Sequence, residues 1–137
     1  LGDVYKRQMI FLASGTGFAP IQALLEQLRE RGDNRRPVYL YWGGRRREDL
    51  YRHEQLLAWE AELPWLRYTP VLSEPTEACD WQGATGFVHR QVVSDFQSLK
   101  GFEVYACGAP NPPRSARRDY VAERGLAEAD FYADAFV

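Results

Sequence analysis

Residues 9–28 read MIFLASGTGFAPIQALLEQL, and this stretch decides the fold. The apolar run 9–13 predicts a buried strand, and a helical pattern begins directly behind the glycines. Gly15 and Gly17 can adopt positive φ and let a ligand approach the bare backbone, while Pro20 suits a first helical turn. The helix is indicated by one apolar stripe, made of Ile21, Leu24, Leu25 and Leu28. Its first N–H groups and positive dipole end would face an anion such as a pyrophosphate.

This corner differs from the dinucleotide fingerprint G-x-G-x-x-G, because Pro20 stands at the third glycine position. The alternative is an ordinary strand-to-helix turn that uses glycine only for tightness. A second corner of the same kind favours nucleotide binding. Residues 103–107 predict another buried strand, which ends at Gly108-Ala109-Pro110 before a further helix. Two glycine-bearing strand ends in an α/β chain are what a cofactor crevice requires.

The remaining pattern alternates strands with helices. We expect strands at 38–42, 66–73, 103–107 and 131–136, helices at 48–63, 88–96 and 115–124, and a loop at 74–86. Leu50, Leu57 and Ala61 are the buried candidates of the helix at 48–63, and Pro70 indicates an edge position for its strand. This alternation predicts an α/β fold with a doubly wound, five-stranded parallel sheet and helices on both faces.

In such a sheet the ligand lies beyond the carboxyl ends of the strands. The glycines of the first corner, Gly43-Gly44, Ser73 and Cys107-Gly108 all fall at those ends. Their convergence predicts one common binding rim.

Composition narrows the function classes. A net charge of −2 gives no reason to expect nucleic acid or a membrane surface as partner, and no apolar stretch has the length of a membrane span. The two cysteines make neither a disulfide framework nor a metal cluster, so a reducing cytoplasm is the expected location. Residues 1–8 fit no structural pattern and resemble a translated sequencing adapter, so we interpret them as a non-native leader before one domain at 9–137.

Four motifs resemble the nucleotide-binding domain of the ferredoxin–NADP reductase superfamily. They are ASGTGFAP (13–20), YWGGRRREDLY (41–51), VYACGAP (104–110) and FYADAFV (131–137). Within that superfamily the chain is most similar to NAD(P)H–flavin reductases and to the iron–sulfur flavoprotein reductases that serve oxygenases and deoxysugar dehydratases. The resemblance implies an upstream FAD-binding barrel, which is missing from this sequence.

The resemblance also implies roles for single residues. Gly15, Thr16 and Gly17 would hold the pyrophosphate and nicotinamide side of the coenzyme. Cys107 and Gly108 would lie beside the nicotinamide at the point of hydride transfer. Asp134 and Phe136 match a terminal acid-x-aromatic element whose ring covers the flavin. The wider cofactor-binding set adds Pro20, Gly43, Gly44, Arg45, Arg46, Ser73 and Pro110. Four of these residues have a structural alternative: Cys107 as a small buried hydrophobe, Phe136 as a core aromatic, Thr16 as a turn residue and Asp134 as a surface carboxylate.

The coenzyme choice is left open by the sequence. Arg45, Arg46 and Arg47 could clamp a 2′-phosphate and select NADPH, or form a solvated face. Glycines occupy the strand end where an NAD-specific acid would stand. We interpret His53 and His89, which lie in helical patterns, as structural or surface residues far from the crevice.

Three functions are compatible with these observations. The first is the C-terminal NAD(P)H-binding half of an FAD-dependent oxidoreductase that passes electrons to an iron–sulfur centre or oxygenase, with a 2Fe–2S cluster elsewhere in the full protein. The second is a free flavin reductase that uses flavin as substrate. The third is a nucleotide-binding module without catalysis.

Overall fold

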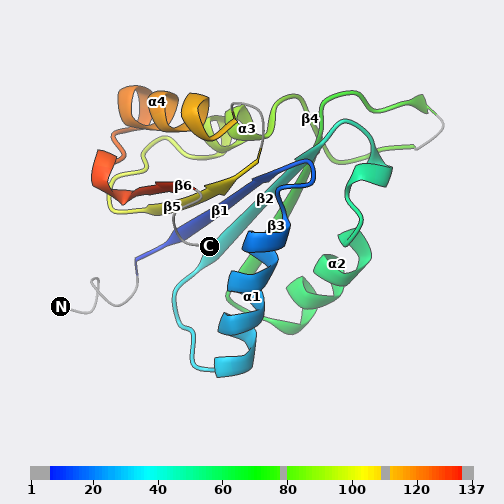
Figure 1. Cartoon of the computed structure of the whole chain (residues 1–137), viewed down its shortest axis with the longest axis horizontal. Coiled ribbons are helices and arrows are strands. Elements are labelled where there is room, and N and C mark those ends of the chain that lie inside the picture. The colour runs from blue at the N-terminus through cyan, green and yellow to red at the C-terminus, as the bar shows by residue number, and fades with distance from the viewer. Residues whose placement is uncertain (1–6, 78–79, 109–111, 134–137) are drawn as a thin grey trace.

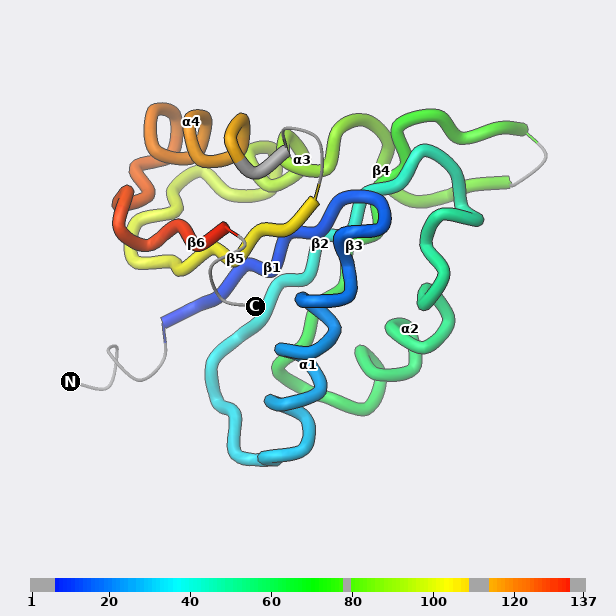
Figure 2. The backbone as a smooth tube through the Cα atoms, viewed as in Figure 1, coloured from blue at the N-terminus to red at the C-terminus, as the bar shows by residue number. Residues whose placement is uncertain are grey.

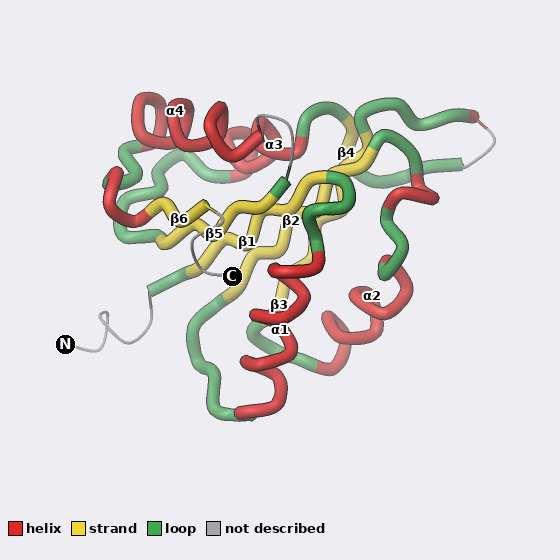
Figure 3. The backbone as a smooth tube through the Cα atoms, in the orientation of Figure 1, coloured by secondary structure: helices red, strands yellow, loops and turns green. Residues whose placement is uncertain are grey.

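A computed structural model describes residues 7–77, 80–108 and 112–133, with no description of the side chains of Pro112 and Pro113. Within this part of the chain, six strands form one sheet in the order β4-β3-β2-β1-β5-β6, and every pairing is parallel (Figure 3). The strands are β1 Met9–Ser14, β2 Val38–Gly44, β3 Leu66–Leu72, β4 Ala84–Thr85, β5 Glu103–Cys107 and β6 Phe131–Ala133. The doubly wound parallel class is therefore confirmed, with one strand more than predicted.

Helices cover both faces of the sheet (Figures 1 and 2). Helices α1 (Ala19–Arg31) and α2 (His53–Glu62) lie on one face, and α3 (Val88–Asp95) and α4 (Pro112–Arg124) lie on the other. Two short 3₁₀ turns, η2 (Arg47–Asp49) and η4 (Glu128–Asp130), precede α2 and β6.

Strand β1 contributes side chains to both hydrophobic cores, one on each face of the sheet. Its successive side chains alternate between the faces, so Phe11 and Ala13 pack toward α1 and α2, while Ile10 and Leu12 pack toward α3 and α4. All four side chains are buried, which explains why this strand reads as a continuous apolar run. The strand is thereby fixed at the centre of the sheet, with its glycine corner at the carboxyl edge.

Helix α1 forms as the sequence predicts. Ile21 and Leu25 are fully buried, and Leu24 and Leu28 pack against the same core from its margin. Gly32 ends the helix in the left-handed conformation, at φ +70°, and its N–H donates to the carbonyl of Leu28 at 3.3 Å.

The second predicted helix is partly wrong. Residues 47–49 form the turn η2, and the α-helix begins only at His53. Leu57 is 41 % exposed and Ala61 is exposed as well, whereas Leu56 and Trp59 are buried. The helix carries two apolar stripes, and the one that contains Leu56 and Trp59 meets the sheet.

The strand β4 was not expected inside the predicted loop 74–86. It pairs only with Val71 and Leu72, so β3 is the outermost strand at the level of Pro70. A proline there removes no ladder hydrogen bond on the outer side, which agrees with the predicted edge position. Helix α4 begins at Pro112 instead of residue 115, because proline is tolerated in a first helical turn. Only residues 131–133 of the predicted last strand, 131–136, lie among the described residues, and these form β6.

Candidate functional site

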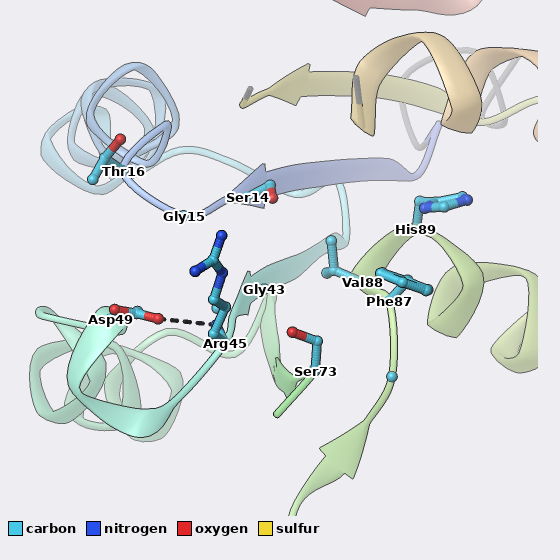
Figure 4. Close-up of a pocket in the computed structure, with 12 residues that line it drawn as sticks. Ser14, Gly15, Thr16, Gly43, Arg45, Asp49, Ser73, Phe87, Val88 and His89 are labelled. Atoms are coloured by element: carbon cyan, nitrogen blue, oxygen red, sulfur yellow. Dashed lines mark hydrogen bonds between the residues drawn. The ribbon is translucent and has the colours of Figure 1, made fainter. Parts of the chain in front are cut away.

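A pocket of about 510 Å³ opens at the carboxyl edge of the sheet (Figure 4). Its walls come from the ends of β1, β2 and β3, from the turn after β2, and from the start of α3. The lining residues are Ser14, Gly15, Thr16, Gly43, Gly44, Arg45, Asp49, Ser73, Gly86, Phe87, Val88 and His89. The size falls within the range of small-molecule and cofactor sites.

The corner after β1 is tied to the end of β2. Gly15 adopts φ +59° with open space beside its α-carbon, and its N–H donates to the carbonyl of Gly43 at 2.7 Å. The Trp42 indole Nε1–H donates to the Gly15 carbonyl at 3.0 Å. Phe18 stacks on Trp42, with ring centroids 4.0 Å apart, and both rings are fully buried. The corner therefore rests on a rigid aromatic base.

The corners after β1 and β5 touch through bare backbone. A β-carbon on Gly17 would lie 2.6 Å from the Gly108 α-carbon, and one on Gly108 would lie 2.7 Å from the Ser14 β-carbon. Gly108 also adopts φ +144°. Neither position has room for a larger residue. Tertiary packing therefore requires glycine at both, and only Gly108 also has the positive φ that favours glycine; Gly17 does not.

The end of β2 is equally tight. A β-carbon on Gly43 would meet Val88 at 2.6 Å, and one on Gly44 would meet the Asp49 β-carbon at 2.8 Å. The Gly44 carbonyl accepts the N–H of Ser73 at 2.9 Å, which joins the β3 end to the same wall.

The three consecutive arginines lie in different surroundings. Arg45 lines the pocket, and its side chain extends toward Gly15 (Figure 4). Arg47 pairs with Glu54 at 2.8 Å. Arg46 is exposed and, within the described part of the chain, has no carboxylate at ion-pair distance. All three side chains are exposed, and they differ in their ion-pair partners.

Six of the predicted cofactor residues line this pocket: Gly15, Thr16, Gly43, Gly44, Arg45 and Ser73. Gly17, Cys107 and Gly108 form the adjoining corner, where Cys107 is only 4 % exposed and stands beside Ala13 in the sheet register. Pro20 lies in the first turn of α1 and Arg46 outside the pocket lining. Cys79, Pro110, Asp134 and Phe136 lie outside the described residues.

The prediction that His89 lies far from the crevice is wrong, because His89 lines the pocket at the start of α3. Its Nε2 lies 3.3 Å from Asp119 Oδ2 on α4, and its ring points away from Arg45 (Figure 4). Burial lowers the His89 pKa below its usual 6.5; Asp119 opposes this shift, and Arg90 and Arg118 add to it. His53 is not among the residues that line this pocket, and its Nδ1 lies 2.9 Å from the Tyr68 hydroxyl.

The predicted cofactor set also missed five other lining residues, which are Ser14, Asp49, Gly86, Phe87 and Val88. Asp49 lies in the turn after β2, and Phe87 is 71 % exposed at the cap of α3. The available signal was positional: Gly86-Phe87 immediately precedes a helix in a fold whose helices begin at the carboxyl edge of the sheet.

The arrangement is suited to binding a ligand that carries both an anionic group and a flat ring. It combines open backbone at Gly15, a guanidinium, a carboxylate and an exposed aromatic ring around one pocket. Residues 7–77, 80–108 and 112–133 contain no group of three or more histidine, cysteine or acidic side chains placed to hold a metal ion. They also contain no helix long and apolar enough to cross a membrane.

Comparisons with known proteins agree with this geometry. The family described as "Oxidoreductase NAD-binding domain" matches residues 11–117. The CDP-6-deoxy-L-threo-D-glycero-4-hexulose-3-dehydrase reductase of Yersinia pestis is 41 % identical over 129 residues, which cover 94 % of this chain and 38 % of that protein. The NAD(P)H-flavin reductase of Vibrio harveyi is 30 % identical, over 96 % of this chain and 54 % of its own length.

Solved structures show the same fold. The Amycolatopsis cytochrome P450 reductase GcoB superposes with a TM-score of 0.81 at 26 % identity, covering 96 % of this chain and 38 % of that one. The chain thus spans less than two thirds of the length of each of these proteins.

Proposed function

The chain belongs to the oxidoreductase NAD-binding domain family, and from this premise we propose that it is the NAD(P)H-binding part of a flavin-dependent reductase. The observation that carries the proposal is the pocket at which the ends of β1, β2 and β3 meet the start of α3. When bound, the nicotinamide supplies a hydride and FAD accepts it, and the protein supplies orientation.

The residues present fit a dinucleotide. The Gly17–Gly108 contact brings the ends of β1 and β5 together at the carboxyl edge of the sheet, where the coenzyme would lie. Gly15 has open space beside its α-carbon, so a pyrophosphate would have room to approach the α1 N-terminus there; the N–H and carbonyl of Gly15 itself are bonded to Gly43 and Trp42. Thr16 would contribute its hydroxyl there, while Cys107 and Gly108 would border the nicotinamide. Dry, close stacking of two rings is what hydride transfer requires.

The adenosine end would occupy the other side of the pocket. Arg45 and Ser73 line that wall, and Phe87 offers a large exposed ring against which a base can pack. Asp134 and Phe136 are proposed to border the flavin, and Pro20, Arg46 and Pro110 to support the loops around the coenzyme.

The proposed acceptor is an iron–sulfur centre or an oxygenase. The relative at 41 % identity is named as a dehydrase reductase, and an electron transfer component of anthranilate 1,2-dioxygenase from Acinetobacter baylyi is 29 % identical. FAD would be held mainly by another domain, preceding a nucleotide domain at residues 9–137, since the chain spans only 38 to 40 % of these relatives. We place the protein in the cytoplasm.

The test is an equilibrium titration of the chain with NADH and with NADPH, followed by quenching of tryptophan fluorescence, since Trp42 lies directly beneath the pocket. We expect weak but saturable quenching by at least one coenzyme, and displacement by ADP-ribose. A chain that is folded by circular dichroism and yet shows no saturable response to either coenzyme would refute the proposal.

A free flavin reductase is the second candidate, because two relatives of that name from Vibrio harveyi are 30 and 33 % identical. Purification of the full-length protein separates the two. A flavin retained in stoichiometric amount indicates the prosthetic form, and a colourless protein that reduces added flavin indicates the substrate form.

A further inference from the structure

A second cavity, of about 420 Å³, lies at the amino edge of the sheet, opposite the pocket at the carboxyl edge. It opens where the segments that follow α1 and α2 enter β2 and β3 (Figure 1). Strand β2 runs from this cavity to the other pocket, and its seven residues span about 20 Å. The cavity has the size of a small-molecule site, and a ligand in it would not touch one bound at the carboxyl edge.

Two arginines line this cavity without a carboxylate partner. Arg35 and Arg67 are both exposed, and within the described residues neither has an acidic group at ion-pair distance, whereas most other arginines do. Arg36, which follows Arg35 directly, pairs with Glu103. None of the described residues that line the cavity is acidic. Two guanidinium groups at one cavity repel each other, and a bound anion would offset that repulsion.

The register of the sheet holds Arg67 beside an aromatic ring. Tyr39 of β2 is paired with Arg67 of β3, so the two side chains lie on the same face of adjacent strands about 4.8 Å apart. The Tyr39 ring is packed against Phe96 and Phe102, with centroids 5.1 and 6.4 Å away. Arg67 Nη1–H donates to the Leu66 carbonyl at 3.4 Å, which leaves most of its N–H donors unused within the described residues.

Trp65 forms another part of the cavity wall. It is half-buried against the core beneath α1 and α2, and its carbonyl accepts the N–H of Val38 at 2.8 Å. The loop that carries Arg35 is braced by Asn34, whose side chain bonds the N–H and the carbonyl of Arg36 at 3.1 and 3.0 Å. The cavity therefore combines two aromatic rings and two guanidinium groups on a fixed backbone.

We infer that this cavity is a second ligand site, for a small aromatic phosphate monoester. The flat ring would pack against Tyr39 and Trp65, and the phosphate would pair with Arg35 and Arg67. Two guanidinium groups favour the double negative charge that a phosphate monoester approaches at neutral pH over the single charge of a carboxylate. This site is separate from the coenzyme pocket and does not depend on the proposed function.

The test uses 1-naphthyl phosphate as the probe and isothermal titration calorimetry at low ionic strength, with excess ADP-ribose to occupy the pocket at the carboxyl edge. The comparison ligands are 1-naphthol, which keeps the rings, and inorganic phosphate, which keeps the charge. We expect saturable binding of the probe at one site per chain, and binding of either comparison ligand at least about tenfold weaker.

Substitutions locate the probe on the molecule. Arg35→Gln and Arg67→Gln should each raise the dissociation constant of 1-naphthyl phosphate by about three- to tenfold. Arg52→Gln is the matched control, because Arg52 is exposed, lies outside this cavity and has no carboxylate at ion-pair distance in the described part of the chain. We expect it to leave the dissociation constant unchanged.

The outcomes separate this inference from the proposed function. A folded chain that shows no saturable binding of the probe would overturn the inference, and so would 1-naphthol that binds as tightly as the phosphate. Equal weakening in Arg52→Gln would indicate unspecific attraction to surface charge, and loss of probe binding on addition of ADP-ribose would assign the probe to the other pocket; both overturn the inference. Failure of the coenzymes and ADP-ribose to bind would refute the proposed function alone, since the arginine substitutions still test the second cavity.

Discussion

The two edges of the sheet are built in opposite ways. At the carboxyl edge, glycines end or follow β1, β2 and β5, and the pocket wall carries the weakly paired Arg45 and the exposed ring of Phe87. At the amino ends of β1 and β5, charged side chains are densely paired. Arg7 contacts Asp130 at 2.7 Å and Glu103 at 3.3 Å, and Arg36 also pairs with Glu103.

The amino-edge network joins three strands at their first residues. Glu103 begins β5 and lies beside Met9 of β1, while Arg36 precedes β2 and donates its Nε–H to the Arg7 carbonyl at 2.8 Å. Asn34 braces the same loop by hydrogen bonds to both the N–H and the carbonyl of Arg36. The charged groups of this amino-edge network therefore neutralise one another, whereas the carboxyl edge presents the weakly paired charge of Arg45 and the exposed ring of Phe87.

We expect the largest loss of stability and coenzyme affinity from a substitution at the carboxyl edge of the sheet. In Gly17→Ala the new β-carbon meets Gly108 backbone atoms at 2.6 and 2.8 Å, and these cannot move aside as a side chain would. We expect a loss of about 1–3 kcal/mol in unfolding free energy and a fall of at least about tenfold in coenzyme affinity, measured by urea denaturation and by titration.

Gly83→Ala is the control for this substitution. Its β-carbon would lie 2.7 Å from the Trp81 ring, which is a side chain and can shift. Coenzyme affinity should be retained in Gly83→Ala. Wild-type stability and affinity in Gly17→Ala would show that the two corners are not in the contact described.

The second prediction concerns the ion pairs at the amino edge of the sheet. Glu103→Gln removes the carboxylate shared by Arg7 and Arg36, in a side chain that is mostly buried. We expect a loss of about 1–2 kcal/mol in unfolding free energy and unchanged coenzyme affinity. Glu62→Gln, which breaks the exposed pair with Arg29, should change stability less. A loss of coenzyme affinity in Glu103→Gln would contradict the separation of the two edges.

These contrasts also show where sequence reasoning succeeds. The β1–α1 unit was predicted correctly because its signals are local: an apolar run, two glycines and a helical stripe ending at Gly32. Strand β4 was missed because two residues carry no periodicity, and they become a strand only by passing beside Val71 and Leu72. The buried face of α2 depends on which apolar stripe meets the sheet, which no local pattern decides.

The pocket residues that local sequence signals indicate were predicted, and those that only tertiary packing brings to the pocket were missed. Gly15 and Gly43 could be predicted because glycines stand there at the ends of apolar strand sequences. In the structure the Gly15 N–H donates to the Gly43 carbonyl. Asp49 and His89 enter the pocket only because the turn after β2 and the start of α3 fold against the same edge. The Gly17–Gly108 contact joins distant parts of the chain and is a property of tertiary packing alone.

A smaller loss of coenzyme affinity is expected at Gly15, which can be compared with Gly32 because the two glycines have similar backbone conformations. Gly15 and Gly32 have φ of +59° and +70°, and a β-carbon at either would meet nothing within 4 Å. Replacement by alanine therefore imposes the same left-handed strain, about 1–2 kcal/mol at each position. Only Gly15→Ala should also lower the affinity for the coenzyme, by a few fold in titration, because Gly32 ends α1 at the opposite edge of the sheet. Equal effects of both variants on coenzyme affinity would mean that Gly15 does not face the ligand.

The smallest effect is a pH dependence at the pocket wall. The folded-state pKa of His89 lies below 6.5, chiefly because of burial, and the groups facing it are Arg90 on α3 and Asp119 and Arg118 on α4. As pH falls through 6.5 toward that lower pKa, the unfolded chain binds more protons than the folded one, so the free energy of unfolding decreases. His89→Asn should reduce this slope between pH 7 and 5.

A second histidine makes the pH dependence a test of position. The pKa of His53 is lowered as well, so His53→Asn should reduce the stability slope in the same direction. The two differ in ligand binding, because protonated His89 would add positive charge beside the pocket and His53 lies outside it. ADP-ribose, which is stable in mild acid, should therefore bind more tightly as pH falls in the wild type and in His53→Asn, but not in His89→Asn. If all three proteins showed the same pH profile for ADP-ribose, the imidazole of His89 would be excluded as a contributor to the field at the carboxyl edge.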